Sequence, residues 1–376
     1  MQVPFSLQAA LQQAVVGGIF PGAVLAIRQG GGPGCFVTAG RLSTDPPGNP
    51  VTPTTVYDLA SLTKPLATVT SLALLAQAGQ CRLDDRLDAH LPELGDASIG
   101  RATIRQLLTH SSGLPGWRGF YERLSPNAVL PSTPQSREDA ERQLLQLIKG
   151  EALLYGMGER SLYSDLGFML LGLVVERLGR TTLDRFVCEH LVQPLKADPL
   201  CYLPGDRETE SLKTSLLDRV APTEWDPWRG RLLCGEVHDE NAAALGGVAG
   251  HAGLFGTAEA VLAVTGAWLM GHHRKKSILN SDVVRDFTSP QNAVPGSSWA
   301  LGWDTPSVPS SSGQYFSSQS FGHLGYTGTS IWIDPACELE VVLLSNRVHP
   351  SRKNERIRAF RPAIHDLVYQ EFVTVR

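Results

Sequence analysis

Strand-like segments lie at both ends of the chain, and this arrangement most constrains the fold. Residues 23–27 and 35–40 are compact apolar segments joined by a glycine-rich turn, which predicts an antiparallel hairpin. Two further segments of this kind, residues 330–333 and 339–345, come near the other end of the chain. We expect both pairs to belong to one discontinuous α/β domain.

The middle of the chain repeats apolar residues at helical spacing. The longest such segment runs from Ser61 to about Gly79 and is apolar on nearly all sides, which is typical of a buried helix. Other helices are expected at residues 7–16, 104–108, 137–147, 166–178, 182–191, 258–270 and 361–372. The order of elements predicts a discontinuous α/β domain formed by residues 1–60 and 240–376, with a mainly helical domain, residues 61–239, inserted into it.

Composition and charge exclude several classes of protein. Apolar residues make up 42% of the 376 residues and charged residues only 19%, which excludes a disordered chain or a coiled coil. A formal net charge of −4 provides no basic surface, so no nucleic-acid partner is expected. No apolar run approaches the roughly 18 residues of a membrane span, so none is predicted.

The N-terminus and the cysteines bear on location and on redox or metal chemistry. Residues 1–20 lack the basic segment and the small-residue cleavage site of a signal peptide, so a complete chain is expected to stay in the cytoplasm. An exported protein whose leader had been removed would look the same. Six cysteines are scattered without a Cys-x-x-Cys pair, which predicts buried thiols and no metal or redox site: Cys35, Cys81, Cys188, Cys201, Cys234 and Cys337.

Ser61 and Lys64 stand three residues apart at the start of the long apolar helix. Residues at this spacing share one face of a helix, so the lysine ammonium can reach the serine hydroxyl. The helix N-terminus and burial are both expected to lower the pKa of this lysine, which favours its action as a base. A serine needs such a partner because its hydroxyl alone is a weak nucleophile. The alternative is that Ser61 only caps an ordinary helix.

Two further segments contain groups suited to acyl transfer. Tyr163 precedes an apolar helix and is placed to pass a proton between the serine and a leaving group. Alternatively, Tyr163 is a packing residue and Asp165 caps that helix. The glycine-containing segment 323–328 precedes a strand, where it presents backbone N–H groups to a developing oxyanion or forms only a turn into a hairpin.

Together these segments resemble a known family. Ser-x-x-Lys at residues 61–64, Tyr163 about a hundred residues later, and His-x-Gly at residues 323–325 follow the motif order of the serine beta-lactamase and penicillin-binding protein superfamily. The surrounding sequence is similar to the class C beta-lactamase-related serine hydrolases, most clearly at residues 58–65, 103–115, 250–257 and 322–328. The resemblance extends from about residue 21 to residue 368.

The resemblance implies a fold and a mechanism. The fold is α+β, a central antiparallel sheet flanked by helices, with an inserted all-α domain and an active-site cleft between the two parts. Ser61 would attack a carbonyl group, Lys64 and Tyr163 would handle the proton, and the backbone N–H groups of Ser61 and Tyr326 would form the oxyanion hole. Gly325 would let the substrate approach the backbone. Water would release the acyl group, and no cofactor would be required.

The predicted substrate-binding residues are Asp165, His323 and Gly325. Asp165 and His323 depart from the motif pattern of the superfamily. The superfamily usually has Asn at the position of Asp165, and a carboxylate cannot donate a hydrogen bond to a substrate amide. Near Lys64, a carboxylate would also oppose the expected lowering of the lysine pKa. Many true beta-lactamases have Lys at the position of His323, and a neutral imidazole attracts a substrate carboxylate only weakly.

The sequence therefore predicts an esterase-type serine hydrolase that forms an acyl-enzyme at Ser61 and acts on a small ester, amide or peptide, with weak or no beta-lactamase activity. Two alternatives stay open: a D-amino-acid peptidase or beta-lactamase, and a non-catalytic binding or sensor relative. His238, Asp239, Glu240 and His251 match no standard metal spacing, so no metal is expected there and hydrogen bonding is the preferred interpretation. The sequence predicts no particular oligomeric state.

Overall fold

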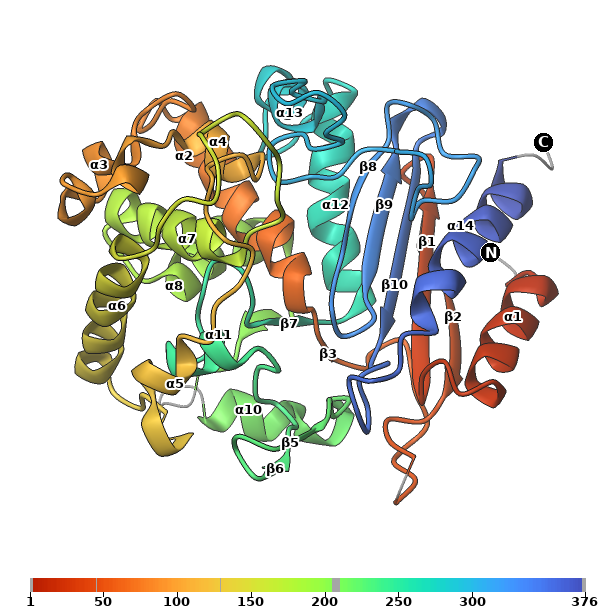
Figure 1. Ribbon diagram of the computed structural model, residues 1–376. Coiled ribbons are helices and arrows are strands. Elements are labelled where there is room, and N and C mark those ends of the chain that lie inside the picture. Colours follow the sequence, from red (N-terminus) through yellow and green to blue (C-terminus); the bar gives the residue numbers. More distant parts are fainter. Residues whose placement is uncertain (1–2, 45, 129, 205–209, 374–376) are drawn as a thin grey trace.

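The central sheet of the molecule has five antiparallel strands in the order β2–β1–β10–β9–β8 (Figure 1). The computed structural model describes residues 3–44, 46–128, 130–204 and 210–373. The strands are β1 (Gly22–Gln29), β2 (Cys35–Gly40), β8 (Phe321–Leu324), β9 (Ser330–Asp334) and β10 (Leu339–Ser345). Val24 of β1 pairs with Leu344 of β10, so the two ends of the chain meet in one sheet. The predicted α+β fold and its N-terminal hairpin are confirmed.

Alternating side chains give each face of the sheet its own apolar cover, because successive residues of a strand point to opposite faces. Leu25 lies in a core cluster with residues of α1 (Phe5–Val16) and α14 (Ile357–Phe372). Its neighbour Val24 belongs to a second, larger cluster that includes α12 (Ala258–His272). Figure 1 shows α1 and α14 on one side of the sheet and α12 on the other.

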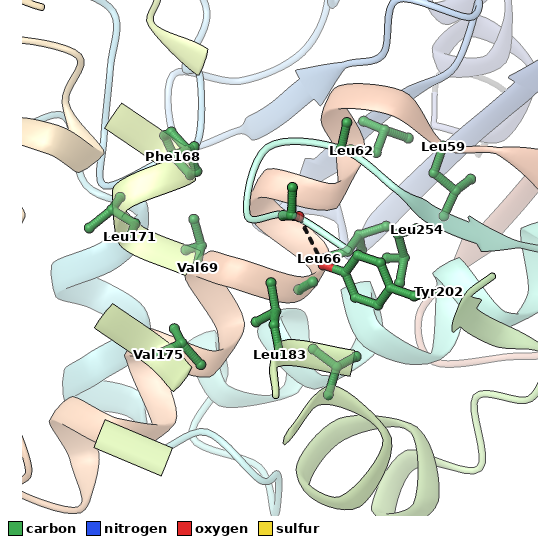
Figure 2. Packing of buried hydrophobic residues seen from close by; sticks show 14 of the residues in the cluster. Leu59, Leu62, Leu66, Val69, Phe168, Leu171, Val175, Leu183, Tyr202 and Leu254 are labelled. Atoms are coloured by element: carbon green, nitrogen blue, oxygen red, sulfur yellow. Dashed lines mark hydrogen bonds between the residues drawn. The ribbon is translucent and has the colours of Figure 1, made fainter. Parts of the chain in front are cut away.

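The larger core cluster continues from the sheet into the helical part of the chain. It includes Leu66 and Val69 from the segment after Ser61, together with Phe168 of α7 (Asp165–Gly179). Figure 2 shows these side chains gathered around the same segment. One continuous core therefore supports the sheet and the helices together. The domain boundaries near residues 60 and 240 and the cleft between the two parts stay predictions.

The long apolar segment expected at residues 61–79 is not one regular helix. It consists of a 3-10 turn (Ala60–Leu62), a π-helical turn (Lys64–Val69) and α2 (Thr70–Gln77). Pro65 contributes to this irregularity, because proline has no backbone N–H to donate and fixes its own φ. Turns of the π type are frequent at functional sites, and this one begins at Lys64.

The other predicted helices are present, with one exception. The helix expected at residues 182–191 ends at Val187 and continues as a π-helical turn, Cys188–Val192. The remaining helices are α3 (Leu87–His90), α4 (Ile104–Leu108), α5 (Tyr121–Leu124), α6 (Pro134–Lys149), α8 (Leu183–Val187), α9 (Gln193–Leu195), α10 (Glu210–Leu216), α11 (Glu240–Ala244) and α13 (Ser281–Thr288). A three-stranded sheet and a short hairpin complete the fold, formed by β3 (Tyr57–Asp58), β4 (Leu200–Tyr202) and β7 (Leu254–Gly256), and by β5 (Trp225–Asp226) and β6 (Arg231–Leu232).

The six cysteines differ in exposure. All are free thiols, but only Cys35 and Cys81 are buried, and Cys188 is exposed. The prediction of buried thiols is therefore confirmed for Cys35 and Cys81 and wrong for Cys188, which begins a π-helical turn and faces outward, and the other three cysteines are half-buried. No helix within the described ranges is both long enough and apolar enough to cross a membrane.

Candidate active site

Ser61 follows a strained backbone position that the surrounding structure holds in place. Ala60 has a φ of +48°, in the left-handed region that residues with a Cβ rarely adopt. The buried Asp58 carboxylate accepts hydrogen bonds from the backbone N–H of Ala60 at 2.8 Å and of His238 at 2.6 Å. Strain of this kind costs about 1–3 kcal/mol and persists only where neighbouring groups fix the backbone. Asp58 thus determines how the chain presents Ser61.

Lys64 places its ammonium group beside the Ser61 hydroxyl. Its side chain is fully buried, and Nζ lies 3.1 Å from Ser61 Oγ and 3.2 Å from the carbonyl oxygen of His251. Nζ also lies 2.6 Å from Asp165 Oδ1 and 4.8 Å from the centre of the Tyr163 ring. The structure therefore brings together the four polar residues predicted around the reaction centre. Ser61 lies inside the 3-10 turn Ala60–Leu62 and not at the N-cap of a helix, so the capping alternative is wrong.

The ion pair with Asp165 overturns the expected pKa of Lys64. Burial lowers the pKa of a lysine, but the Asp165 carboxylate and the Tyr163 hydroxyl outweigh that effect, so the pKa of Lys64 is raised. The prediction of a lowered pKa is wrong because it considered burial and the helix terminus without this partner. The sequence also predicts that a carboxylate near Lys64 would oppose a lowering of the lysine pKa. Asp165 has this effect.

Tyr163 is buried and completes a set of hydroxyl and ammonium groups around Ser61. Its hydroxyl forms hydrogen bonds with Lys64 and Ser61. Burial raises the pKa of Tyr163 and the Lys64 ammonium opposes that increase. Ser164, not Asp165, caps α7, because Ser164 Oγ accepts the N–H of Gly167 at 3.3 Å. The Asp165 side chain is therefore directed to Lys64 instead of the helix terminus.

The segment with Tyr326 is tied to the backbone that precedes Ser61. Thr327 Oγ1 donates to the Asp58 carbonyl at 2.7 Å, and Thr329 Oγ1 donates to the Leu59 carbonyl at 3.1 Å. Gly325 allows this close approach, because a Cβ there would collide with Thr329 Oγ1 and lie 2.7 Å from the Leu59 carbonyl oxygen. β8 is an edge strand that ends at Leu324, and the residues from 325 to 328 form the turn of its hairpin with β9, as the turn alternative predicts.

His323 lies in β8 with a buried, neutral imidazole. Its Nδ1 is 2.8 Å from the Leu324 carbonyl oxygen, which can only accept, so Nδ1 carries the proton and Nε2 is an acceptor. Burial, with a contribution from the Lys64 ammonium, lowers the pKa of His323 to about 3. The predicted neutral state is confirmed, and its ring centre lies 6.0 Å from that of Tyr163.

His110 is a site residue to which the sequence analysis assigned no role. Its Nδ1 accepts the backbone N–H of Ser164 at 3.1 Å, and its ring packs 4.7 Å from Tyr163 and 4.5 Å from Trp299. Burial, reinforced by Lys64, lowers its pKa well below the usual value, so this imidazole is also neutral. The available signal was its position inside the family-like segment 103–115, because a histidine in an otherwise apolar and hydroxyl-rich segment requires a partner.

The group around His251 is held by hydrogen bonds. His251 Nε2 lies 2.8 Å from Asp239 Oδ1, and the same carboxylate oxygen caps α11 by accepting the N–H of Ala242 at 2.8 Å. These contacts order the backbone at His251, and the His251 carbonyl oxygen accepts a hydrogen bond from Lys64 Nζ. Among the described residues, no group of three or more His, Cys, Asp or Glu side chains is arranged to hold a metal ion.

Comparison with known proteins identifies the family to which this arrangement belongs. A family model described as Beta-lactamase matches residues 7–363. The chain belongs to the Beta-lactamase family. It is 33% identical over 310 residues to an Escherichia coli K12 protein named "Putative D-alanyl-D-alanine carboxypeptidase", covering 78% of this chain and 70% of that one. It is also 33% identical over 311 residues to an N-acetylmuramyl-L-alanine amidase of Bacillus subtilis 168, covering 78% and 68% of the two chains.

Solved structures share the fold of this Beta-lactamase family member. EstCE1, described as a hydrolase with promiscuous acyltransferase activity, superimposes with a TM-score of 0.73 at 22% identity and covers 96% of this chain and 97% of its own. An octameric penicillin-binding protein homologue from Pyrococcus abyssi superimposes with a TM-score of 0.72 at 19% identity, covering 96% and 76%. The chain is thus a serine hydrolase of the Beta-lactamase family with the expected fold.

Proposed function

We propose that Ser61 is the nucleophile of an esterase-type hydrolase that forms an acyl-enzyme with small esters or amides. The observation that carries this proposal is the 3.1 Å contact between Lys64 Nζ and Ser61 Oγ at a fully buried ammonium. A lysine is costly to bury away from water, so a structural role alone gives little reason for its presence there. Tyr163 bonds to both groups and completes the means of moving a proton to and from Ser61.

The backbone N–H groups of Ser61 and Tyr326 form the oxyanion hole in this proposal. Support comes from the two threonine hydrogen bonds that hold the Tyr326 segment against the Asp58 and Leu59 carbonyls, directly before Ser61. Arg347 adds to this support, because its Nε donates to the Tyr326 carbonyl at 2.8 Å and its guanidinium lies 4.5 Å from the Tyr326 ring centre. Donors fixed before the reaction stabilise a developing negative charge at little reorganisation cost.

Asp165, His323 and Gly325 are the proposed substrate-facing residues, and the first two favour an ester over a beta-lactam. The neutral His323 provides no positive charge for the carboxylate that beta-lactams carry, and Asp165 offers no N–H to an acylamide carbonyl. An ester substrate needs neither interaction. Weak or absent beta-lactam turnover follows from these two side chains.

A D-amino-acid peptidase that acts on peptidoglycan-like peptides is the second candidate. The similarity to the proteins named as a carboxypeptidase and an amidase, at 33% identity, favours it. A non-catalytic binding relative is the alternative of another class, but such a protein has no need of Ser61, Lys64 and Tyr163 in mutual contact.

Labelling with a fluorophosphonate probe tests the nucleophile directly. We expect the wild type to be labelled and Ser61→Ala to remain unlabelled. The matched control is Ser71→Ala, which removes another buried hydroxyl, in α2, and should label like the wild type. Equal labelling of the wild type and Ser61→Ala, or no labelling of either, would contradict the proposal. Initial rates on a short-chain nitrophenyl ester, a D-alanyl dipeptide and a chromogenic cephalosporin then separate the two enzymatic candidates.

A further inference from the structure

The hydrogen bonds around Lys64 leave its ammonium unable to accept a proton from Ser61. Nζ lies 2.6 Å from an Asp165 carboxylate oxygen, 3.1 Å from Ser61 Oγ and 3.2 Å from the His251 carbonyl oxygen, and the Tyr163 hydroxyl also bonds to it. A protonated lysine has three N–H donors and no acceptor, so it donates to the Ser61 hydroxyl and cannot take its proton. Lys64 must first pass a proton to another group before it can act as a base.

Among the described residues, the carboxylate of Asp165 is the anionic group nearest to Lys64 Nζ. The groups that face the ammonium from the neighbouring elements are the Tyr163 hydroxyl before α7, the His110 ring after α4, the His323 ring on β8 and Asp239 at the start of α11. No hydrogen bond joins either imidazole to Nζ among the described residues: Ser164 engages His110 Nδ1, Leu324 engages His323 Nδ1, and the Nε2 atom of each ring is buried without a hydrogen-bond partner. Asp239 already accepts from His251 and from the N–H of Ala242. The side chain of Asp165 is 17% exposed, so its carboxylate also reaches solvent.

We propose that Asp165 is the proton acceptor of the acylation step, a role that rests on the proposed function of Ser61 as nucleophile. As Ser61 Oγ forms its bond to the substrate carbonyl carbon, one N–H bond of Lys64 breaks and its proton forms an O–H bond with Asp165. The lone pair released on Nζ takes the proton of Ser61 Oγ. Lys64 keeps its charge throughout, and the negative charge moves from Asp165 to the carbonyl oxygen.

Collapse of the tetrahedral intermediate reverses the proton path. The bond between the carbonyl carbon and the leaving group breaks, and the leaving oxygen or nitrogen takes a proton from Lys64 or Tyr163. The proton held by Asp165 then returns to that group, so the carboxylate and the ammonium are restored with the acyl group on Ser61. In this scheme the aspartate supplies the base that a lysine of raised pKa cannot supply alone.

The pH dependence of kcat/KM for ester hydrolysis tests this proton path, using Asp165→Asn and Asp165→Glu. In the wild type and in Asp165→Glu, activity on the acidic side requires an ionised carboxyl group. In Asp165→Asn no carboxylate contacts Nζ, so Lys64 must lose its proton to solvent before it can take the proton of Ser61. We expect the acidic limb of Asp165→Asn to lie more than one pH unit above that of the wild type, because carboxyl and lysine groups ordinarily titrate about six pH units apart.

An acidic limb that coincides in the wild type and Asp165→Asn would overturn the proposal. Fluorophosphonate labelling of the same preparations keeps the two proposals apart, because an unlabelled wild type contradicts Ser61 as nucleophile and not the proton path. A measurement on the wild type alone covers the case in which Asp165→Asn does not fold. The ester acylation rate in mixtures of H₂O and D₂O should depend on the deuterium fraction along a curve, since two protons move, and a straight line would contradict the transfer.

Discussion

The Asp58 carboxylate accepts the backbone N–H of Ala60 at 2.8 Å and so holds a residue with positive φ directly before Ser61. The other carboxylate oxygen of Asp58 accepts the backbone N–H of His238. The backbone carbonyl oxygen of Asp58 accepts a hydrogen bond from the Thr327 hydroxyl. One buried residue therefore connects Ser61 to two segments that lie far away in the sequence. Asp58 acts as a positioning residue, because it touches the backbone around Ser61 and none of the proton-transferring side chains described above.

Asp58→Asn should lower both stability and kcat. An amide keeps the size of the side chain but places an N–H₂ group against a backbone N–H, so one hydrogen bond to a charged acceptor is lost. Such a bond is worth about 1.5–3 kcal/mol, and we expect the free energy of unfolding to fall by about that amount. If the strain at Ala60 then relaxes and misplaces Ser61, kcat falls about tenfold or more with little change in KM.

Urea denaturation and steady-state ester kinetics measure the two effects of Asp58→Asn. The control is Asp282→Asn, at a side chain that is 79% exposed, and it should leave both quantities unchanged. A variant that is destabilised but keeps the wild-type kcat would show that Asp58 supports the fold without positioning Ser61.

Gly325→Ala should disrupt the proposed oxyanion hole without removing any polar group. The added Cβ collides with Thr329 Oγ1 and the Leu59 carbonyl oxygen, so the Tyr326 segment must move away from Ser61. Loss of one oxyanion donor typically costs about 10²–10³ in kcat, and we expect a loss of at least about 10² on an ester. Gly150→Ala is the matched control, because a Cβ at Gly150 meets only ordinary contacts. Wild-type kcat in Gly325→Ala would argue against Tyr326 as a donor.

Local sequence patterns were sufficient to predict most of the fold. Alternating apolar residues in the terminal strands and helical periodicity in the middle reflect burial of one face at a time, which a sequence displays directly. The antiparallel central sheet came from the family resemblance, and the order of its strands was not predicted, because pairing between Val24 and Leu344 depends on contacts that no local pattern records. The irregular helix after Ser61 was missed although Pro65 is visible in the sequence, because proline is also common in the first turn of a regular helix.

The site was predictable as a set of residues but not as an electrostatic state. Spacing and resemblance indicated Ser61, Lys64 and Tyr163, and the structure places them in contact. The shift in the pKa of Lys64 was predicted in the wrong direction. The direction of this shift depends on a 2.6 Å contact with Asp165, which lies about a hundred positions away in the sequence. His110 was overlooked because its partners, the Ser164 amide and the Trp299 ring, are defined only by the folded chain.

Buried neutral histidines should make the protein lose stability on mild acidification. Burial lowers the pKa of His323 to about 3 and of His365 to about 4, whereas a histidine in the unfolded chain titrates near 6.5. Below pH 6.5 the unfolded chain therefore binds protons that the folded chain does not, so stability falls as the pH falls. Each such histidine contributes about 1.4 kcal/mol per pH unit, down to its folded pKa.

His365→Gln isolates one of these contributions. We expect the dependence of the free energy of unfolding on pH, measured with urea between pH 6.5 and 4.5, to become shallower by about 1.4 kcal/mol per pH unit. His190→Gln, at an exposed position, should leave the slope unchanged. An identical slope in His365→Gln and the wild type would mean that His365 is protonated in the folded protein.

Asp165→Asn should raise turnover of a chromogenic cephalosporin relative to turnover of a nitrophenyl ester. The amide can donate a hydrogen bond to the acylamide carbonyl of a beta-lactam, an interaction that the carboxylate cannot make and that a simple ester does not use. A hydrogen bond of about 0.5–1.5 kcal/mol corresponds to a rise of roughly 2- to 10-fold in the ratio of kcat/KM values. Both reactions begin at Ser61, so any general loss of proton transfer in the variant cancels in the ratio. A ratio that stays constant or falls would show that residue 165 acts on Lys64 alone and does not face the substrate.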